Sequence, residues 1–132
     1  AVVDGGMDLN ARPLLYGAQH PFYVISKDSR LLSSEFDMPD IGVRGMMVVG
    51  TCCESGDSLC LDSHANSAPR KMAEPETGDL IVIGGAGAYC SAMAPFNYNS
   101  HLQAPEVLYT TDKQLKLIRK RQTLEQMVAN EL

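Results

Sequence analysis

The sequence lacks several features that would assign it to a class of protein. No apolar run approaches the length of a membrane-spanning helix, so we expect no membrane partner. The basic residues form no cluster longer than the three at Arg119–Arg121, and the net charge is -5, which argues against binding of nucleic acid. There is no recognisable signal peptide, internal repeat or low-complexity segment. These observations favour an ordinary globular domain.

Metal-ligand patterns are also missing. The chain has 4 cysteines but no C-x-x-C pair, which argues against a zinc ribbon. His64 and His101 have no partners at metal-ligand spacing, and we expect both to be surface residues and no metal site to exist. Free cysteines in a reducing cytoplasm are the simplest account of the thiols. We therefore predict a cytoplasmic protein without disulfides.

The 132 residues are enough for one domain, and 45% of them are hydrophobic and 20% charged. Short strand-like segments dominate, and the fold class predicted is mainly β, a barrel or sandwich with short helices. The chain opens directly on the apolar segment 1–3, which we expect of a piece cut from a longer protein. The predicted strands are 2–4, 21–26, 46–52, 58–61, 80–83, 106–109 and 114–118. We expect 80–83 to be fully buried and the last two strands to form a hairpin. The predicted helices are one turn within 7–17, a short one in 87–94 and one over 123–131 that begins with a capping box of Thr123 and Gln126, and the predicted loops include 33–45 and 62–76.

The chain is organised around residues 48–57, where the apolar run Met46–Val49 gives way to Cys53, Glu54 and the turn Ser55-Gly56-Asp57. A side chain at the end of a strand is well placed for catalysis. The acidic neighbours Glu54 and Asp57 favour a protonated thiol, which suits a proton donor better than a nucleophile. The alternative is that Cys53 is a small buried hydrophobic residue, as most free cysteines are.

Other candidate features are weaker on their own. Arg12 and Tyr16 would share one face of a helical turn, although a surface arginine and a core tyrosine explain them equally well. The glycine-rich turn 84–89 could bind phosphate, but it matches neither the Walker nor the dinucleotide fingerprint.

Together, these segments resemble a known family. The resemblance covers nearly the whole chain, and its most specific motif is Cys-Glu-Ser-Gly-Asp at 53–57. In this order the segments resemble the C-terminal domain of the diaminopimelate decarboxylase family, of the alanine-racemase-like, fold-type III group of pyridoxal phosphate enzymes. The matching segments are 3–7, 12–17, 50–57, 78–79, 87–89, 97–100, 105–108 and 118–123.

The resemblance implies a Greek-key, β-barrel-like domain packed beside a (β/α)8 barrel that carries the lysine anchoring pyridoxal phosphate. That barrel is absent from residues 1–132, which would be inactive alone. The resemblance further implies a homodimer, in which the Cys-Glu motif completes the partner subunit's site. The expected substrate is a small-molecule amino acid, meso-diaminopimelate, and the expected reaction is its decarboxylation to L-lysine.

The resemblance also implies residue roles. Cys53 would protonate Cα after CO2 leaves, and Arg12 with Tyr16 would hold the distal carboxylate of the substrate. Glu54 would hold the distal ammonium, and Tyr89 would contact both cofactor and substrate.

Three residues depart from the family pattern. Thr51, Gly85 and His101 stand where the family usually has Pro, Asp and Arg. The segment from Cys90 to Asn97 also appears one residue longer. Three alternatives therefore remain open: a related decarboxylase for ornithine, arginine or a carboxylated polyamine, a non-catalytic homologue used for dimerisation or regulation, and an unrelated small β-domain with a free-thiol activity.

Overall fold

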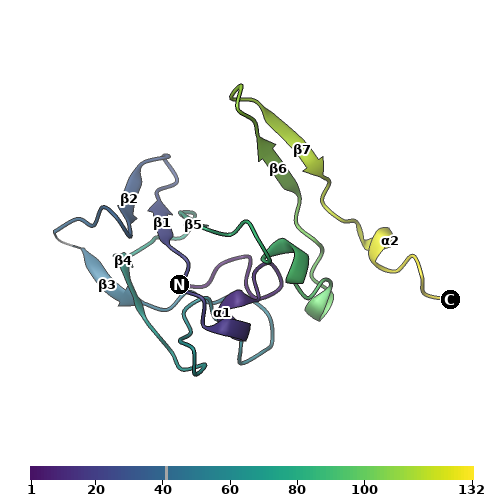
Figure 1. The fold of residues 1–132 in the computed structure, drawn as a ribbon, viewed down its shortest axis with the longest axis horizontal. Coiled ribbons are helices and arrows are strands. Elements are labelled where there is room, and N and C mark those ends of the chain that lie inside the picture. Colours follow the sequence, from purple (N-terminus) through teal and green to yellow (C-terminus); the bar gives the residue numbers. More distant parts are fainter. Residues whose placement is uncertain (41) are drawn as a thin grey trace.

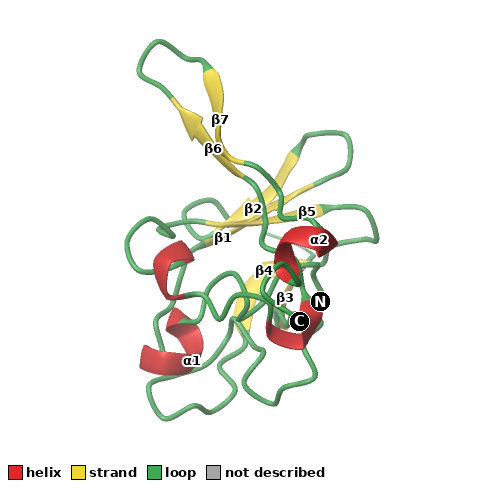
Figure 2. Cartoon of the chain, turned by 90° about the vertical axis from the view of Figure 1, so that its right-hand side faces the viewer, coloured by secondary structure: helices red, strands yellow, loops and turns green. Residues whose placement is uncertain are grey.

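The computed structural model describes residues 1–40 and 42–132, and its regular elements are short strands joined by long connections (Figure 1). In Figure 2 strands and loops dominate, and the helices are single short turns. The elements in chain order are α1 (Arg12–Tyr16), β1 (Phe22–Ile25), β2 (Leu31–Ser34), β3 (Val43–Met46), β4 (Arg70–Ala73), β5 (Leu80–Ile83), the 3-10 turns η1 (Ser91–Met93) and η2 (Tyr98–Ser100), β6 (Glu106–Tyr109), β7 (Leu115–Arg119) and α2 (Leu124–Met127).

The strands form three antiparallel sheets. β1 lies in the middle of the order β2-β1-β5, and two separate pairs, β3-β4 and β6-β7, complete the set. The prediction of a mainly β fold with short helices is confirmed. Within the described residues, however, these sheets do not join into a closed barrel.

The core lies where β1 and β4 meet the segment that follows β3. Phe22 and Val24 alternate with half-buried residues along β1, as expected of a strand with one face in the core. They pack with Val48 and Met72, which are also almost fully buried. The core residues are Phe22, Val24, Val48, Leu59, Cys60 and Met72.

Several predicted elements have different bounds. The strand predicted at 46–52 is wrong: β3 ends at Met46, and Val49 makes only single bridges to Val2 and Ser58. The predicted loops 33–45 and 62–76 contain the ends of β2, most of β3 and all of β4, while Ile41 lies outside the described residues. These strands escape detection because few of their side chains are buried: β3 has none, and β4 has only Met72.

Three other predictions need correction. The strand at 80–83 was expected to be fully buried, but Leu80 and Val82 are exposed and only the alternate residues face the core. The helix in 87–94 is a single 3-10 turn, and α2 ends at Met127 rather than at 131. The N-terminus of α2 is as predicted, because Thr123 and Gln126 form a capping box. None of the described helices is long and apolar enough to cross a membrane.

The hairpin β6-β7 and α2 extend away from the core (Figure 1). Their strands are paired as the sequence predicts, from Glu106 opposite Arg119 to Tyr109 opposite Leu115. Both strands carry exposed apolar side chains, including Val107, Leu115 and Leu117. This arm therefore packs little of its own apolar surface within the chain.

Candidate functional site

A tight loop presents Cys53 and Glu54 to the outside. Its ends are joined by the Gly50 N–H, which donates to the Asp57 carbonyl at 3.3 Å. The Asp57 carboxylate is buried and accepts the N–H of Cys52 at 2.7 Å and that of Met7 at 2.8 Å. Asp57 therefore turns inward and anchors the loop, while Cys53 and Glu54 stay exposed at its tip.

Two glycines make room for this anchor. A Cβ on Gly6 would lie 1.9 Å from Asp57 Oδ1, and one on Gly50 would lie 2.5 Å from Oδ2. No larger residue could occupy either position without moving the carboxylate. The Gly-Thr-Cys-Cys-Glu-Ser-Gly-Asp stretch is thus a folded unit locked to the N-terminal segment.

Glu54 is held in its charged form by neighbouring donors. Its carboxylate accepts the Gly56 N–H at 3.2 Å, the Tyr98 hydroxyl at 3.0 Å and the Ser55 hydroxyl at 3.1 Å. The bonds from Gly56 and Tyr98 in particular lower the pKa of Glu54. The bond between Tyr98 and Glu54 also raises the pKa of Tyr98. Glu54 can therefore offer a fixed negative charge to a cationic group.

The segment 97–101 supports the same loop. Asn99 Oδ1 accepts the Cys53 N–H at 2.7 Å, with Asn99 in a left-handed conformation of φ 49°. Asn97 is fixed in turn by Gln122, whose Oε1 accepts its Nδ2 at 2.6 Å. The backbone of Cys53 is thus positioned by a residue 46 places away in the sequence.

Arg12 and Tyr16 are the first and last residues of α1, as the predicted helical turn requires. Pro13 lies in the first turn and Gly17 ends the helix with φ 62°, both typical of these positions. Leu14 packs onto the motif loop, since a Cβ on Gly56 would lie 2.5 Å from Leu14 Cδ1. The helix is therefore seated against the loop that carries Cys53 and Glu54.

Tyr89 lies apart from this group. It is 65% exposed, with φ 68°, and follows the glycine-rich turn after β5. Within the described residues no hydrogen bond joins Tyr89 to Cys53, Glu54 or Arg12. Its ring is free to contact a group outside this chain.

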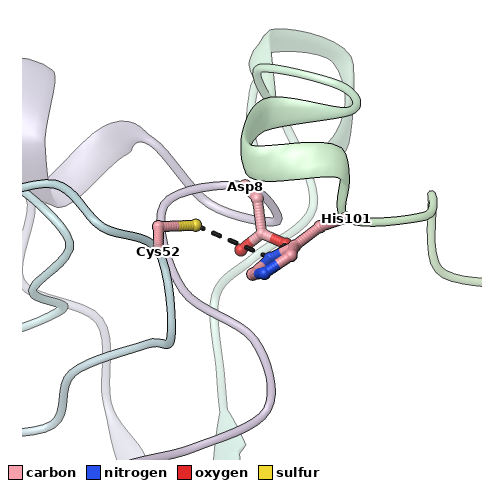
Figure 3. Close-up of side chains that lie close together, drawn as sticks. All are labelled: Asp8, Cys52 and His101. Carbon is pink, nitrogen blue, oxygen red and sulfur yellow. Dashed lines mark hydrogen bonds and ion pairs between the residues drawn. The ribbon is translucent and has the colours of Figure 1, made fainter.

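Sequence reasoning missed one cluster beside the loop, formed by Asp8, Cys52 and His101 (Figure 3). His101 Nδ1 lies 3.1 Å from Asp8 Oδ2 and 3.7 Å from Cys52 Sγ. Burial, together with the charges of Asp57 and Asp8, raises the pKa of the Cys52 thiol to about 11. The expectation that His101 is a surface residue without partners is wrong, whereas His64 is exposed as predicted.

No linear signal could have revealed this cluster. Cys52 and His101 are 49 residues apart, and Asp8 and His101 are 93 apart. Only the folding of three separate segments around Asp57 and Asn99 brings them together. All four cysteines are free, as predicted.

Fold and motif loop together define the class of protein. The model of the pyridoxal-dependent decarboxylase C-terminal sheet domain matches residues 1–87, and the chain belongs to this family. The fold-type III assignment is thereby supported.

The particular relatives are diaminopimelate decarboxylases. The Escherichia coli K12 enzyme is 36% identical over 131 residues, covering 99% of this chain and 29% of its own length. The Neisseria meningitidis serogroup B (MC58) enzyme is 37% identical over 131 residues, covering 99% and 27%. The chain thus spans less than a third of the length of these relatives.

Solved structures give the same result. A crystal structure of diaminopimelate decarboxylase has a TM-score of 0.86 at 35% identity, covering 97% of this chain and 28% of that one. The Helicobacter pylori diaminopimelate decarboxylase complexed with L-lysine has a TM-score of 0.72 at 34% identity, covering 97% and 27%. This chain is therefore homologous to the C-terminal part of such enzymes.

Proposed function

We propose that this chain is the C-terminal domain of a diaminopimelate decarboxylase that converts meso-diaminopimelate to L-lysine. The observation that carries the proposal is its similarity to diaminopimelate decarboxylases over nearly all of its residues. The exposed Cys53-Glu54 loop supports it further, because side chains that point outward from the chain can complete a site formed with another domain.

The residues of this chain fit a pyridoxal phosphate site to which the chain contributes one part and another domain contributes the rest. Cys53, Glu54, Tyr16 and Tyr89 are all exposed, so each is available to a group held outside the chain. When bound, pyridoxal phosphate supplies the electron sink that makes loss of CO2 possible. Tyr89 would contact it, and a (β/α)8 barrel of the whole protein would supply the anchoring lysine.

Cys53 Sγ is the proposed proton donor to Cα of the substrate after CO2 has left. The Asn99 bond fixes the N–H of Cys53 and the Asp57 bond fixes that of Cys52, which positions the thiol for transfer. Among the residues that the structure describes, no base forms a hydrogen bond with this thiol, and the histidine of the nearby cluster contacts Cys52 instead. This environment favours a donor over a nucleophile, and it argues against an unrelated domain with free-thiol activity.

Glu54, Arg12 and Tyr16 are the proposed readers of the substrate's remote end. The charged Glu54 would bind the distal ammonium, and Arg12 with Tyr16 would bind the distal carboxylate. Leu14 couples the two groups, since it lies on the helix of Arg12 and packs against Gly56. A homodimer is proposed as well, with the exposed loop serving the partner subunit's site.

Cys53→Ala in the whole enzyme tests the proposal. We expect kcat for CO2 release from meso-diaminopimelate to fall by about 10²- to 10⁴-fold, with a smaller change in KM. The reason is that the proposed acid would act on the substrate after CO2 has left, and not on the substrate as it first binds. Cys53→Ser, which keeps the size but weakens the acid, should lose nearly as much. An unchanged kcat would overturn the role of Cys53. A wild type with no decarboxylase activity would favour the non-catalytic homologue.

A further inference from the structure

The cluster of Asp8, Cys52 and His101 consists of three metal-ligating side chains from three separate segments (Figure 3). Asp8 lies before α1, Cys52 lies in the motif loop and His101 follows η2. Their donor atoms all lie within 4.8 Å of one another. We propose that these residues bind a divalent cation of the zinc class, which clamps the loop of Cys53 to the segments that flank it.

Two of the three donor-atom separations are close to those around a tetrahedral ion. Zinc lies about 2.3 Å from a thiolate sulfur, about 2.0 Å from a histidine nitrogen and about 2.1 Å from a carboxylate oxygen. Tetrahedral angles then place nitrogen about 3.5 Å from sulfur and about 3.4 Å from oxygen. The observed separations, 3.7 Å from His101 Nδ1 to Cys52 Sγ and 3.1 Å to Asp8 Oδ2, differ from these values by only a few tenths of an ångström.

Hydrogen bonding alone serves this cluster poorly. His101 Nδ1 faces both Cys52 Sγ and Asp8 Oδ2, yet one ring nitrogen either donates a proton or accepts one. If it donates to Asp8 it cannot accept from the thiol, and if it accepts from the thiol it leaves two acceptors facing each other. A cation satisfies all three donor atoms at once. The proton of Cys52 then leaves to solvent as sulfur binds the metal.

The same geometry argues against a catalytic thiol. A nucleophile, histidine and acid act in series when the two partners contact different ring nitrogens. Here both contact Nδ1, so no relay through the ring exists. Binding of a metal is therefore the chemistry that this arrangement supports.

The surroundings can supply the remaining ligand. A hollow of about 440 Å³ opens beside the cluster, lined in part by Asp4, Asp8, His101 and Arg121. It admits a water to the fourth position of the ion. The positive charge of Arg121 opposes binding of a cation here, and the negative charge of Asp4 offsets it. A further negative charge is nearby, because the Asp57 carboxylate accepts the Cys52 N–H. Sulfur and nitrogen donors select zinc or cobalt over magnesium and calcium.

The consequence for the site is positional. Cys52 precedes Cys53 directly, and His101 lies two residues after Asn99, which bonds the Cys53 N–H. A metal joining Cys52 to His101 therefore fixes both supports of the proposed proton donor. The metal itself takes no part in the proposed decarboxylation.

The test is titration of the whole protein that contains this chain with Co²⁺ under reducing conditions, followed by optical absorption. We expect one Co²⁺ per chain, with a thiolate-to-cobalt charge-transfer band and the visible bands of a tetrahedral ion, both displaced by Zn²⁺. Cys52→Ser should abolish the charge-transfer band, and Asp8→Asn and His101→Gln should each raise the Kd by at least about tenfold. Circular dichroism checks that each variant is folded. If Cys52→Ser does not fold, the loss of affinity in His101→Gln tests the site instead.

Two matched controls make the assignment specific. Cys53→Ser removes the adjacent exposed thiol, and His64→Ala removes an exposed histidine; neither should change the spectrum or the Kd. Retention of the charge-transfer band in Cys52→Ser, its loss in Cys53→Ser, or the absence of any tetrahedral Co²⁺ spectrum would overturn the proposal.

Discussion

At the scale of single residues, Glu54 shows how neighbours prepare a side chain for binding. It is fully exposed, yet Gly56, Tyr98 and Ser55 direct three donors at its carboxylate. These bonds hold the oxygen atoms in one orientation and lower the pKa of Glu54. A carboxylate fixed in this way binds an ammonium group with less loss of side-chain entropy than a mobile one.

Tyr98→Phe tests this preparation. Loss of the hydroxyl should raise the pKa of Glu54, since a donor to the charged form is removed. In the whole enzyme we expect KM for diaminopimelate to rise severalfold with little change in kcat, because Glu54 in its proposed role would hold the substrate in the ground and transition states alike. NMR titration of the Glu54 carboxyl and steady-state kinetics provide the two measurements.

Tyr109→Phe is the control for this prediction. Tyr109 is an exposed tyrosine on β6, and its hydroxyl should affect neither quantity. If Tyr98→Phe left both the pKa and KM unchanged, the bond to Glu54 would have no part in binding.

The sequence was informative about the site residues only in part. Cys53, Glu54 and the Arg12–Tyr16 turn belong to contiguous motifs, and the structure places the first two on an exposed loop and the last two in α1. Asp57, Asn99 and Tyr98 support the site through contacts that span long separations. Their roles could not be read from the sequence, because nothing near them in the chain indicates which backbone groups they meet.

At the scale of elements, the sequence predicted those helices and turns that depend on interactions between neighbouring residues. The capping box of α2, the β6-β7 hairpin and the turn α1 depend on nearby residues, and all of them form. β4 depends instead on pairing with β3, and its charged residues Arg70 and Lys71 conceal it. The apolar run that follows β3 was predicted to be a strand, yet its residues reach the core without regular pairing.

The turns before β2 and β5 are joined by one carboxylate. Asp79 accepts the N–H of Glu76 at 2.8 Å and that of Lys27 at 3.0 Å, and these bonds lower the pKa of Asp79, the Glu76 bond most. Because the folded state binds this proton less tightly, the stabilisation is present above the ordinary pKa and is lost as pH falls through the folded value.

We therefore expect Asp79→Ala to lower the free energy of unfolding at neutral pH. We also expect that free energy to decrease less on acidification in the variant than in the wild type. Urea unfolding at pH about 7 and about 3 measures both effects. Asp28→Ala, an exposed acid in the same β1-β2 turn, should behave as the wild type. An acid dependence in Asp79→Ala equal to that of the wild type would refute this account.

Gly6→Ala tests the anchoring of the motif loop. The added Cβ would lie 1.9 Å from the buried Asp57 Oδ1, which also bonds the Met7 N–H. Moving the carboxylate breaks its hydrogen bonds to the buried Met7 N–H and the half-buried Cys52 N–H, so we expect destabilisation of about 2–4 kcal/mol by urea unfolding.

Gly87→Ala is the matched control, since no atom lies within 4 Å of its Cβ position. It should change the free energy of unfolding by no more than about 0.5 kcal/mol. Equal effects of the two substitutions would mean that Asp57 does not depend on the space at Gly6.

At the scale of the whole molecule, the described residues form three sheets rather than the barrel that the resemblance implied. Closure of a barrel depends on pairings between distant strands, which sequence patterns do not specify. The exposed apolar residues of β6 and β7, and a length less than a third of that of the relatives, both agree with a chain that completes its packing in a larger protein.

Substrate choice also belongs to this scale, because in the proposed function Arg12 and Glu54 would act together in a site closed by the rest of the enzyme. Lysine and ornithine have the distal ammonium but lack the distal carboxylate. Either would leave Arg12 unpaired, and an unpaired charge in a closed site costs several kcal/mol. We expect kcat/KM for meso-diaminopimelate to exceed that for lysine, ornithine or arginine by about a thousandfold or more.

Arg12→Ala should narrow this difference by losing the diaminopimelate reaction, without gaining activity on the other three amino acids. The measurement is kcat/KM for all four substrates with wild type and variant, and Arg30→Ala, a change of an exposed arginine in the β1-β2 turn, is the control. Comparable wild-type values for diaminopimelate and for ornithine or arginine would refute the substrate assignment and favour a related decarboxylase. The same measurement would leave the roles of Cys53 and the cofactor intact, because proton donation to Cα does not depend on the remote end of the substrate.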